Sequence, residues 1–130
     1  MTKTGRITRF ALALIFAFCL PLTAIAGVMD DAHGTWKLDV EKTTKANGGE
    51  VNAPFDVVTV DKASNTFIMK DTASGHEGPM RFTPQNPTAT SVVLQITGGP
   101  AMRLEMKGKN EMSLIGLEDG RDQEALCFTR

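Results

Sequence analysis

Apolar and polar residues alternate along most of the chain after Gly34, in short runs that glycine, proline, asparagine and aspartate interrupt. A period of two residues is typical of strands with one buried face and one exposed face, whereas a helical face repeats every three to four residues. The chain is therefore predicted to be all-β. The pattern predicts about eight strands, at residues 35–40, 55–60, 66–70, 80–83, 92–97, 102–107, 111–117 and 124–129.

The connections between these strands contain turn-forming residues. Residues 41–53 are polar and include Asn47-Gly48-Gly49, which predicts a loop with room for one helical turn. Residues 61–65 are predicted to form a hairpin turn, and residues 71–78 a loop. Pro84 has no amide hydrogen, so we expect it to end the fourth strand or to lie at a sheet edge.

Short connections favour antiparallel pairing between consecutive strands, which gives a meander. A meander of eight strands can remove its exposed edges by closing on itself. The prediction is a small up-and-down barrel, whose interior is wide enough for side chains or for one small ligand. A two-sheet β-sandwich is the alternative, which the pattern does not distinguish from the barrel.

The inward positions of the predicted strands are apolar and form the expected lining of the interior. The lining residues are Trp36, Leu38, Phe67, Met69, Phe82, Met102, Leu104, Met106 and Leu114. We hypothesise that they bind a small apolar or amphipathic molecule. The alternative is that these side chains only fill one another's space.

The first 26 residues have a different pattern. Three cations precede an apolar run of 13 residues, 10–22, which leads into Ala24-Ile25-Ala26. This order is typical of a cleavable secretory signal peptide. As a helix the run is about 20 Å long, which is shorter than the hydrocarbon core of a bilayer. A signal anchor that is retained without cleavage is the competing interpretation. We expect cleavage after Ala26, a single domain at residues 27–130 with no membrane span, and a periplasmic or extracellular location.

Signal cleavage changes both the charge and the cysteine count. Three of the 14 Lys and Arg residues would be lost, leaving 11 against 15 Asp and Glu, which is a formal charge of −4. An acidic domain without a basic cluster argues against nucleic acid and anionic lipid as partners. Cys19 would leave with the signal, so Cys127 has no partner for an intramolecular disulfide and is predicted to be a buried thiol.

Candidate chemistry in the mature chain is sparse. His33 and His76 each have acidic neighbours, but a metal site would need three or four ligands to converge from distant loops, so we expect no metal or cofactor. Neither histidine lies in a motif for nucleophilic catalysis, so an enzyme is not expected. The methionines of the predicted strands, Met102 and Met106 among them, are interpreted as core residues that suit irregular interiors.

The opening strand contains Gly34-Thr35-Trp36, which resembles the Gly-x-Trp signature of lipocalin-like barrels. In that family the tryptophan closes one end of the barrel. The resemblance implies that Gly34 and Trp36 are structural residues at the barrel base. A fold does not by itself specify a function.

Two functions are compatible with the sequence. The first is an exported, non-enzymatic barrel that binds a small apolar or amphipathic ligand in its interior. The second is a protein-binding module, such as a periplasmic inhibitor or immunity-type protein, that uses its loops or an edge strand. The acidic balance and the loops at 41–53 and 71–78 would suit a basic protein partner.

Overall fold

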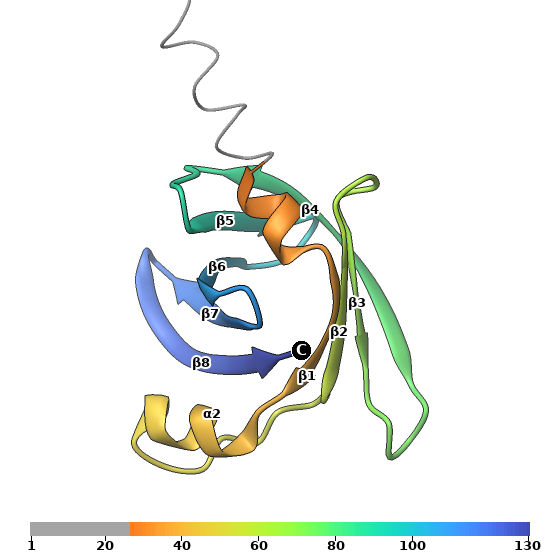
Figure 1. Cartoon of the computed structure of the whole chain (residues 1–130), viewed down its shortest axis with the longest axis vertical. Coiled ribbons are helices and arrows are strands. Elements are labelled where there is room, and N and C mark those ends of the chain that lie inside the picture. Colours follow the sequence, from red (N-terminus) through yellow and green to blue (C-terminus); the bar gives the residue numbers. More distant parts are fainter. Residues whose placement is uncertain (1–26) are drawn as a thin grey trace, which may run out of the picture.

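The computed structural model describes residues 27–130, and the predicted signal peptide lies outside them. These residues form eight antiparallel strands and few helices (Figure 1). No helix in this part of the chain has the length and apolar content needed to cross a bilayer. The elements are β1 (Gly34–Leu38), α2 (Val40–Asn47), β2 (Val57–Asp61), β3 (Thr66–Lys70), β4 (Glu77–Gln85), β5 (Ser91–Ile96), β6 (Ala101–Gly108), β7 (Glu111–Glu118) and β8 (Arg121–Thr129).

The strands form a meander that closes into a ring. Each strand pairs with the next, and β8 pairs back with β1 through Lys37 opposite Thr129 and Leu38 opposite Phe128. The predicted eight-stranded antiparallel meander is confirmed, and its closure is barrel-like. We call the junction between β8 and β1 the seam.

One end of the ring is closed by a helical turn at residues 27–32, far from α2 in Figure 1. Trp36 is fully buried at this end, and its Nε1 donates a hydrogen bond of 2.8 Å to the carbonyl of Ala32. The Arg130 guanidinium lies 4.1 Å from the centre of the Trp36 ring, in a cation–π arrangement. Gly34 has φ of 128°, and a Cβ there would lie 3.2 Å from Arg130 Nη1. Glycine is favoured here because residues with a Cβ rarely adopt a positive φ of this size.

The segment after β1 forms the two-turn helix α2 because both of its ends are capped. The Asp39 side chain accepts a hydrogen bond of 3.0 Å from the Lys42 amide, and Gly48 ends the helix with φ of 69°. The prediction of a loop with one helical turn at 41–53 therefore underestimated the helix. Val40 was predicted to extend the first strand, and this was wrong, because Val40 begins α2 with 66% of its surface exposed.

Helix α2 serves as a hydrogen-bonding partner for the edge of β8. Asn47 accepts from the Ala125 amide at 2.9 Å and donates to the Ala125 carbonyl at 2.7 Å. One turn earlier, Thr43 Oγ1 accepts from the Cys127 amide at 2.9 Å. Thr43 and Asn47 are four residues apart, which is about 6 Å along a helix, and Ala125 and Cys127 are two residues apart, which is about 6.8 Å along a strand. The similar spacings let the two helix side chains reach alternate residues of β8. The edge of β8 is thereby covered where β1 does not pair with it.

Strand β4 begins earlier than predicted and continues through Pro84. The amide of Phe82 donates to the carbonyl of Asn65, on the side where β3 lies. Amides two residues apart in a strand point to the same side, so an amide at Pro84 would also point there. Since the pairing of β3 with β4 stops at Arg81, no ladder bond is lost at Pro84. The proline therefore occupies a local edge and does not end the strand.

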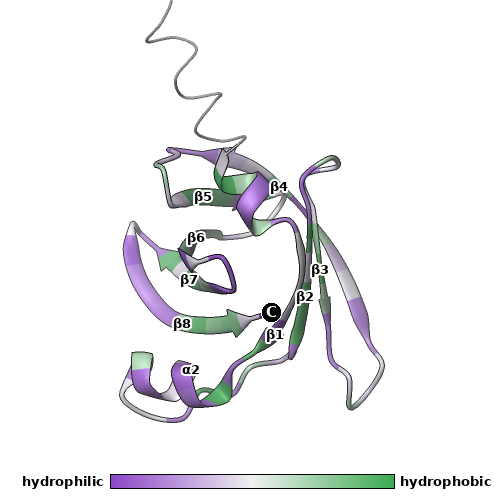
Figure 2. Ribbon diagram, viewed as in Figure 1, coloured by the Kyte–Doolittle hydropathy of each residue, from purple (hydrophilic) through white to green (hydrophobic). Residues whose placement is uncertain are grey.

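The interior of the ring is one apolar cluster that includes the helical turn at 27–32 and residues from all eight strands. Figure 2 shows β8 changing from hydrophilic in its first half to hydrophobic in its second half. Cys127 is free and 7% exposed, on the outward side of β8 beneath α2, and not in the interior. Its Sγ lies 3.6 Å from Ser113 Oγ.

Replacing Asn47 with alanine tests the role of α2 at the seam. Asn47→Ala leaves the Ala125 amide and carbonyl without their side-chain partner, so the free energy of unfolding should fall by about 1–3 kcal/mol. Alanine is the better helix former, so a loss cannot come from helix propensity. Urea unfolding of the mature protein measures the change, with the exposed Lys45→Ala as the control. An equal effect of the two variants would contradict the role.

Candidate ligand-binding site

A pocket of about 390 Å³ lies beside the seam, between the connecting segment 51–55 and strands β6, β7 and β8. Its volume is within the range of small-molecule sites, about 300–1,000 Å³. We call it the seam pocket. Its lining residues are Val51, Asn52, Ala53, Pro54, Phe55, Met102, Leu114, Gly116, Gln123, Glu124 and Leu126.

The seam pocket exists because β1 leaves the ring early. After Leu38 the chain turns into α2, so β1 offers no partner for β8 before Phe128. The space beside Leu126 is instead bordered by the connecting segment 51–55. Gly116 pairs with Met102 on the inner face of the sheet, and its missing side chain leaves additional room.

Phe55 forms one wall of the seam pocket and is held by its neighbours. Its ring stacks on Phe128, with centroids 6.1 Å apart and planes at 10°. The next residue, Asp56, accepts hydrogen bonds from both the amide and the hydroxyl of Thr72, and its own amide donates to the Lys70 carbonyl at 3.0 Å. The Thr72 hydroxyl holds the pKa of Asp56 below its usual value. These contacts fix the end of the connecting segment against β3.

A second, smaller hollow of about 250 Å³ lies on the other side of Phe55. Pro54 and Phe55 border both hollows, so these two residues separate them. The remaining lining residues of the smaller hollow are Met69, Asp71, His76, Glu77 and Gly78.

A β-bulge in β8 directs two consecutive residues toward the seam pocket. Ile115 pairs with Ala125, but Leu117 pairs with Asp122, so β8 contains one residue more than β7 between these pairs. Successive residues of a regular strand point to opposite faces, whereas a bulge breaks that alternation. Gln123 and Glu124 consequently both line the pocket.

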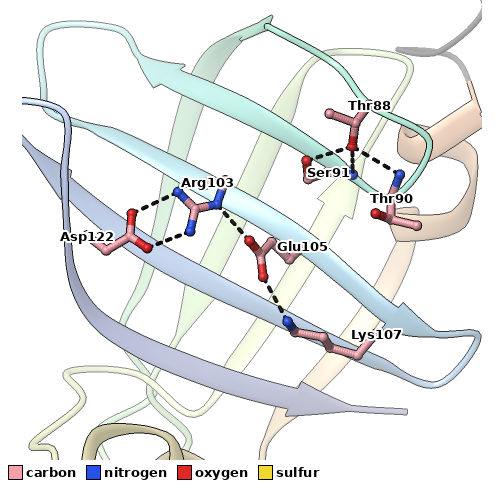
Figure 3. Close-up of polar contacts among 7 residues, drawn as sticks. All are labelled: Thr88, Thr90, Ser91, Arg103, Glu105, Lys107 and Asp122. Atoms are coloured by element: carbon pink, nitrogen blue, oxygen red, sulfur yellow. Dashed lines mark hydrogen bonds and ion pairs between the residues drawn. The ribbon is translucent and has the colours of Figure 1, made fainter.

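The bulge is anchored from the outer face of the ring (Figure 3). Arg103 of β6 reaches across β7 to Asp122 with two hydrogen bonds of 2.8 and 2.7 Å, and its Nε donates to Glu105 at 2.8 Å. Lys107 donates to the other oxygen of Glu105 at 2.8 Å. Arg103 lowers the pKa of Asp122, and Lys107 followed by Arg103 lowers the pKa of Glu105. The residue before the bulge is thus fixed by a bidentate ion pair.

The structure places all nine predicted lining residues in or against the apolar interior. Buried residues are Trp36, Phe67, Phe82, Leu104 and Leu114, and partly buried ones are Leu38, Met69, Met102 and Met106. Three of them border one of these two hollows: Met102 and Leu114 line the seam pocket, and Met69 lines the smaller one. The other six pack within the core and line neither hollow. The predicted lining therefore describes the core better than it describes a binding site.

Most of the seam pocket was not identified from the sequence. Residues 51–55 belong to a connection or a strand end, and Gln123 and Glu124 are polar, so none was a candidate for an apolar lining. Leu126 was placed in the last strand without being assigned to the site. The available signal was Gly116, because a glycine within an apolar strand marks a bulge or a close approach.

The histidines take different positions. His33 Nδ1 accepts a hydrogen bond of 3.2 Å from the Lys62 amide near the closed end of the ring. His76 borders the smaller hollow. Within residues 27–130, no group of three or more His, Cys, Asp or Glu side chains is placed to hold a metal ion.

The ion pairs at the bulge predict a pH dependence of stability. Because Asp122 and Glu105 have lowered pKa values in the folded state, their stabilisation is complete above their unfolded pKa values and is lost as pH falls through the folded values. Arg103→Met should reduce the loss of unfolding free energy between about pH 5 and pH 3. Urea unfolding at several pH values measures this loss. The control is Arg81→Met, which removes an arginine that forms no ion pair in the described chain. It should lose as much unfolding free energy as the wild type over this pH range. If Arg103→Met also loses as much as the wild type, the ion pairs do not anchor the bulge.

The chain was compared with models of protein families, with curated proteins and with solved structures. No family model, curated protein or solved structure matches it.

Proposed function

We propose that the mature protein is an exported, non-enzymatic binding protein whose seam pocket holds a small apolar or amphipathic molecule. The observation that carries the proposal is a pocket of about 390 Å³ that reaches the apolar inner face of the ring. Its apolar walls are formed by Phe55, Met102, Leu114 and Leu126. Each square ångström of apolar ligand surface removed from water contributes about 25 cal/mol.

The lining of the pocket combines fixed apolar residues, one flexible apolar residue and polar residues. One wall consists of paired strands β6, β7 and β8, which hold Leu114 and Leu126 in fixed positions. Met102 adds a flexible thioether side chain that can adapt to irregular shapes. The polar residues Asn52, Gln123 and Glu124 would orient the polar end of an amphipathic ligand.

We infer that the ring is a small up-and-down barrel of lipocalin-like type. Closure of β8 on β1 and the presence of Gly34 and Trp36 at the closed end support this inference. The basic, apolar and small-residue order of residues 1–26 supports export to a periplasm or the exterior.

The alternative of a protein-binding module would normally use an exposed apolar patch. Large hydrophobic side chains in the described part of the chain are exposed only at Val40, on α2, and at Ile68, on β3. The seam pocket therefore supports ligand binding better than it supports docking of a protein.

Partly filling the pocket should weaken binding. Gly116→Val places a branched side chain on the inner face, and its Cβ would meet Gln123 Cβ at 3.5 Å, an ordinary contact. The apolar fluorophore N-phenylnaphthylamine should bind the wild type and lose about tenfold or more in affinity to this variant, because the lost burial of about 60 Å² is worth roughly 1.5 kcal/mol. Fluorescence titration measures the Kd. The matched control is Gly108→Val, at an exposed position in open space, which should bind the fluorophore with wild-type affinity. Equal affinities of all three proteins would show that the fluorophore does not bind in the seam pocket.

Removing the Phe55 ring should enlarge the site. Phe55→Ala deletes the wall between the two hollows, so probes too large for the seam pocket should bind more tightly than they bind the wild type. The loss of stacking on Phe128 should lower the unfolding free energy by about 1–3 kcal/mol. Displacement of N-phenylnaphthylamine by a graded series of alkanols measures the change in size preference. The exposed Val40→Ala serves as the control, and an unchanged preference in Phe55→Ala would show that Phe55 does not limit the site.

A further inference from the structure

Glu124 is the one ionisable residue among the eleven that line the seam pocket. No residue of the described chain forms a hydrogen bond or an ion pair with its carboxylate. The other polar residues of the lining, Asn52 and Gln123, are neutral amides. The pocket therefore presents a single negative charge next to apolar walls.

The position of Glu124 is set by the backbone. The extra residue in β8 turns Gln123 and Glu124 toward the pocket, and the bidentate pair of Arg103 with Asp122 holds the strand immediately before them. Leu126, two residues further along β8, contributes to the apolar wall of the same pocket. A carboxylate and an apolar surface are thus placed side by side on one strand.

The smaller hollow beyond Phe55 has the same sign of charge. Its ionisable lining residues are Asp71, His76 and Glu77, and neither hollow is lined by lysine or arginine. Glu77 lies 3.7 Å from Lys70 Nζ, and Asp71 accepts a hydrogen bond from Ser74, so both carboxylates have partners within the protein. A ligand carboxylate would find no lysine or arginine in the lining of either hollow.

We propose that the seam pocket selects amphiphiles with a cationic head group, such as a protonated alkylamine, over those with a carboxylate. This inference rests on the proposed function. The apolar chain of the ligand lies against Met102, Leu114 and Leu126, and the ammonium group lies at the rim beside Glu124. The formal charge of −4 on the mature chain favours the approach of the same ligands.

Three amphiphiles with the same chain and different heads test the proposal: octylamine, octanol and octanoate. Their affinities for the mature protein at pH 7 are measured by displacement of N-phenylnaphthylamine. Octylamine should bind about two- to fivefold more tightly than octanol, since an exposed ion pair contributes little, and octanoate should bind most weakly. Higher salt concentration should reduce the difference.

Two matched variants assign the preference to one carboxylate. Glu124→Gln should lower octylamine affinity about two- to fivefold and leave octanol affinity unchanged. Glu118→Gln makes the same change of net charge on an exposed residue of β7 that does not line the pocket, and it should retain the preference for octylamine.

The possible failures are distinguishable. If the wild type binds none of the three compounds and does not bind N-phenylnaphthylamine, the proposed function itself is wrong. If all three compounds bind equally well, the apolar pocket stands and the selectivity for cations is overturned. If Glu118→Gln lowers octylamine affinity as much as Glu124→Gln, the preference comes from net charge, which also overturns the assignment to Glu124.

Discussion

The closure of the ring depends on a short seam between the first and last strands. Only two residue pairs join β1 to β8, because β1 ends at Leu38. The unpaired edge of β8 would attract other strands if it were open. Thr43 and Asn47 of α2 bond to alternate residues of this edge, so a helix completes what a longer β1 would have supplied. These side chains extend a closure that the two residue pairs between β1 and β8 begin.

The same seam produces the pocket. Where β1 leaves, the interior beside Leu126 is bordered by the connecting segment 51–55 and not by a strand, and the hollow opens there. Elsewhere the interior is filled by Trp36, Phe67, Phe82 and the residues packed around them. The bulge near the start of β8 places Glu124 beside the pocket, in the part of β8 that has no β1 neighbour. Closure of the fold and the proposed binding chemistry therefore depend on one structural feature.

The period of two residues was sufficient to predict the strands and their antiparallel order, because half-buried strands impose that period directly. It did not predict α2, because Thr43 and Asn47, the residues of α2 that bond to β8, are polar, although Asp39 and Gly48 were available as capping signals. It also could not place Glu124 at the pocket. A bulge changes the face of the sheet to which a side chain points, and its position depends on the register between β7 and β8. The alternation of apolar and polar residues within one strand does not reveal that register. The core was predictable, whereas the site depends on where the pattern is interrupted.

Amide hydrogen exchange at Ala125 and Cys127 tests the central claim most directly. In the structure these two amides donate to Asn47 and Thr43, so they should exchange as slowly as amides in the ladder between β6 and β7. Exchange followed by NMR in the mature protein provides the comparison residue by residue. Fast exchange at both positions, with slow exchange retained between β6 and β7, would show that α2 does not complete the ring and would contradict the account.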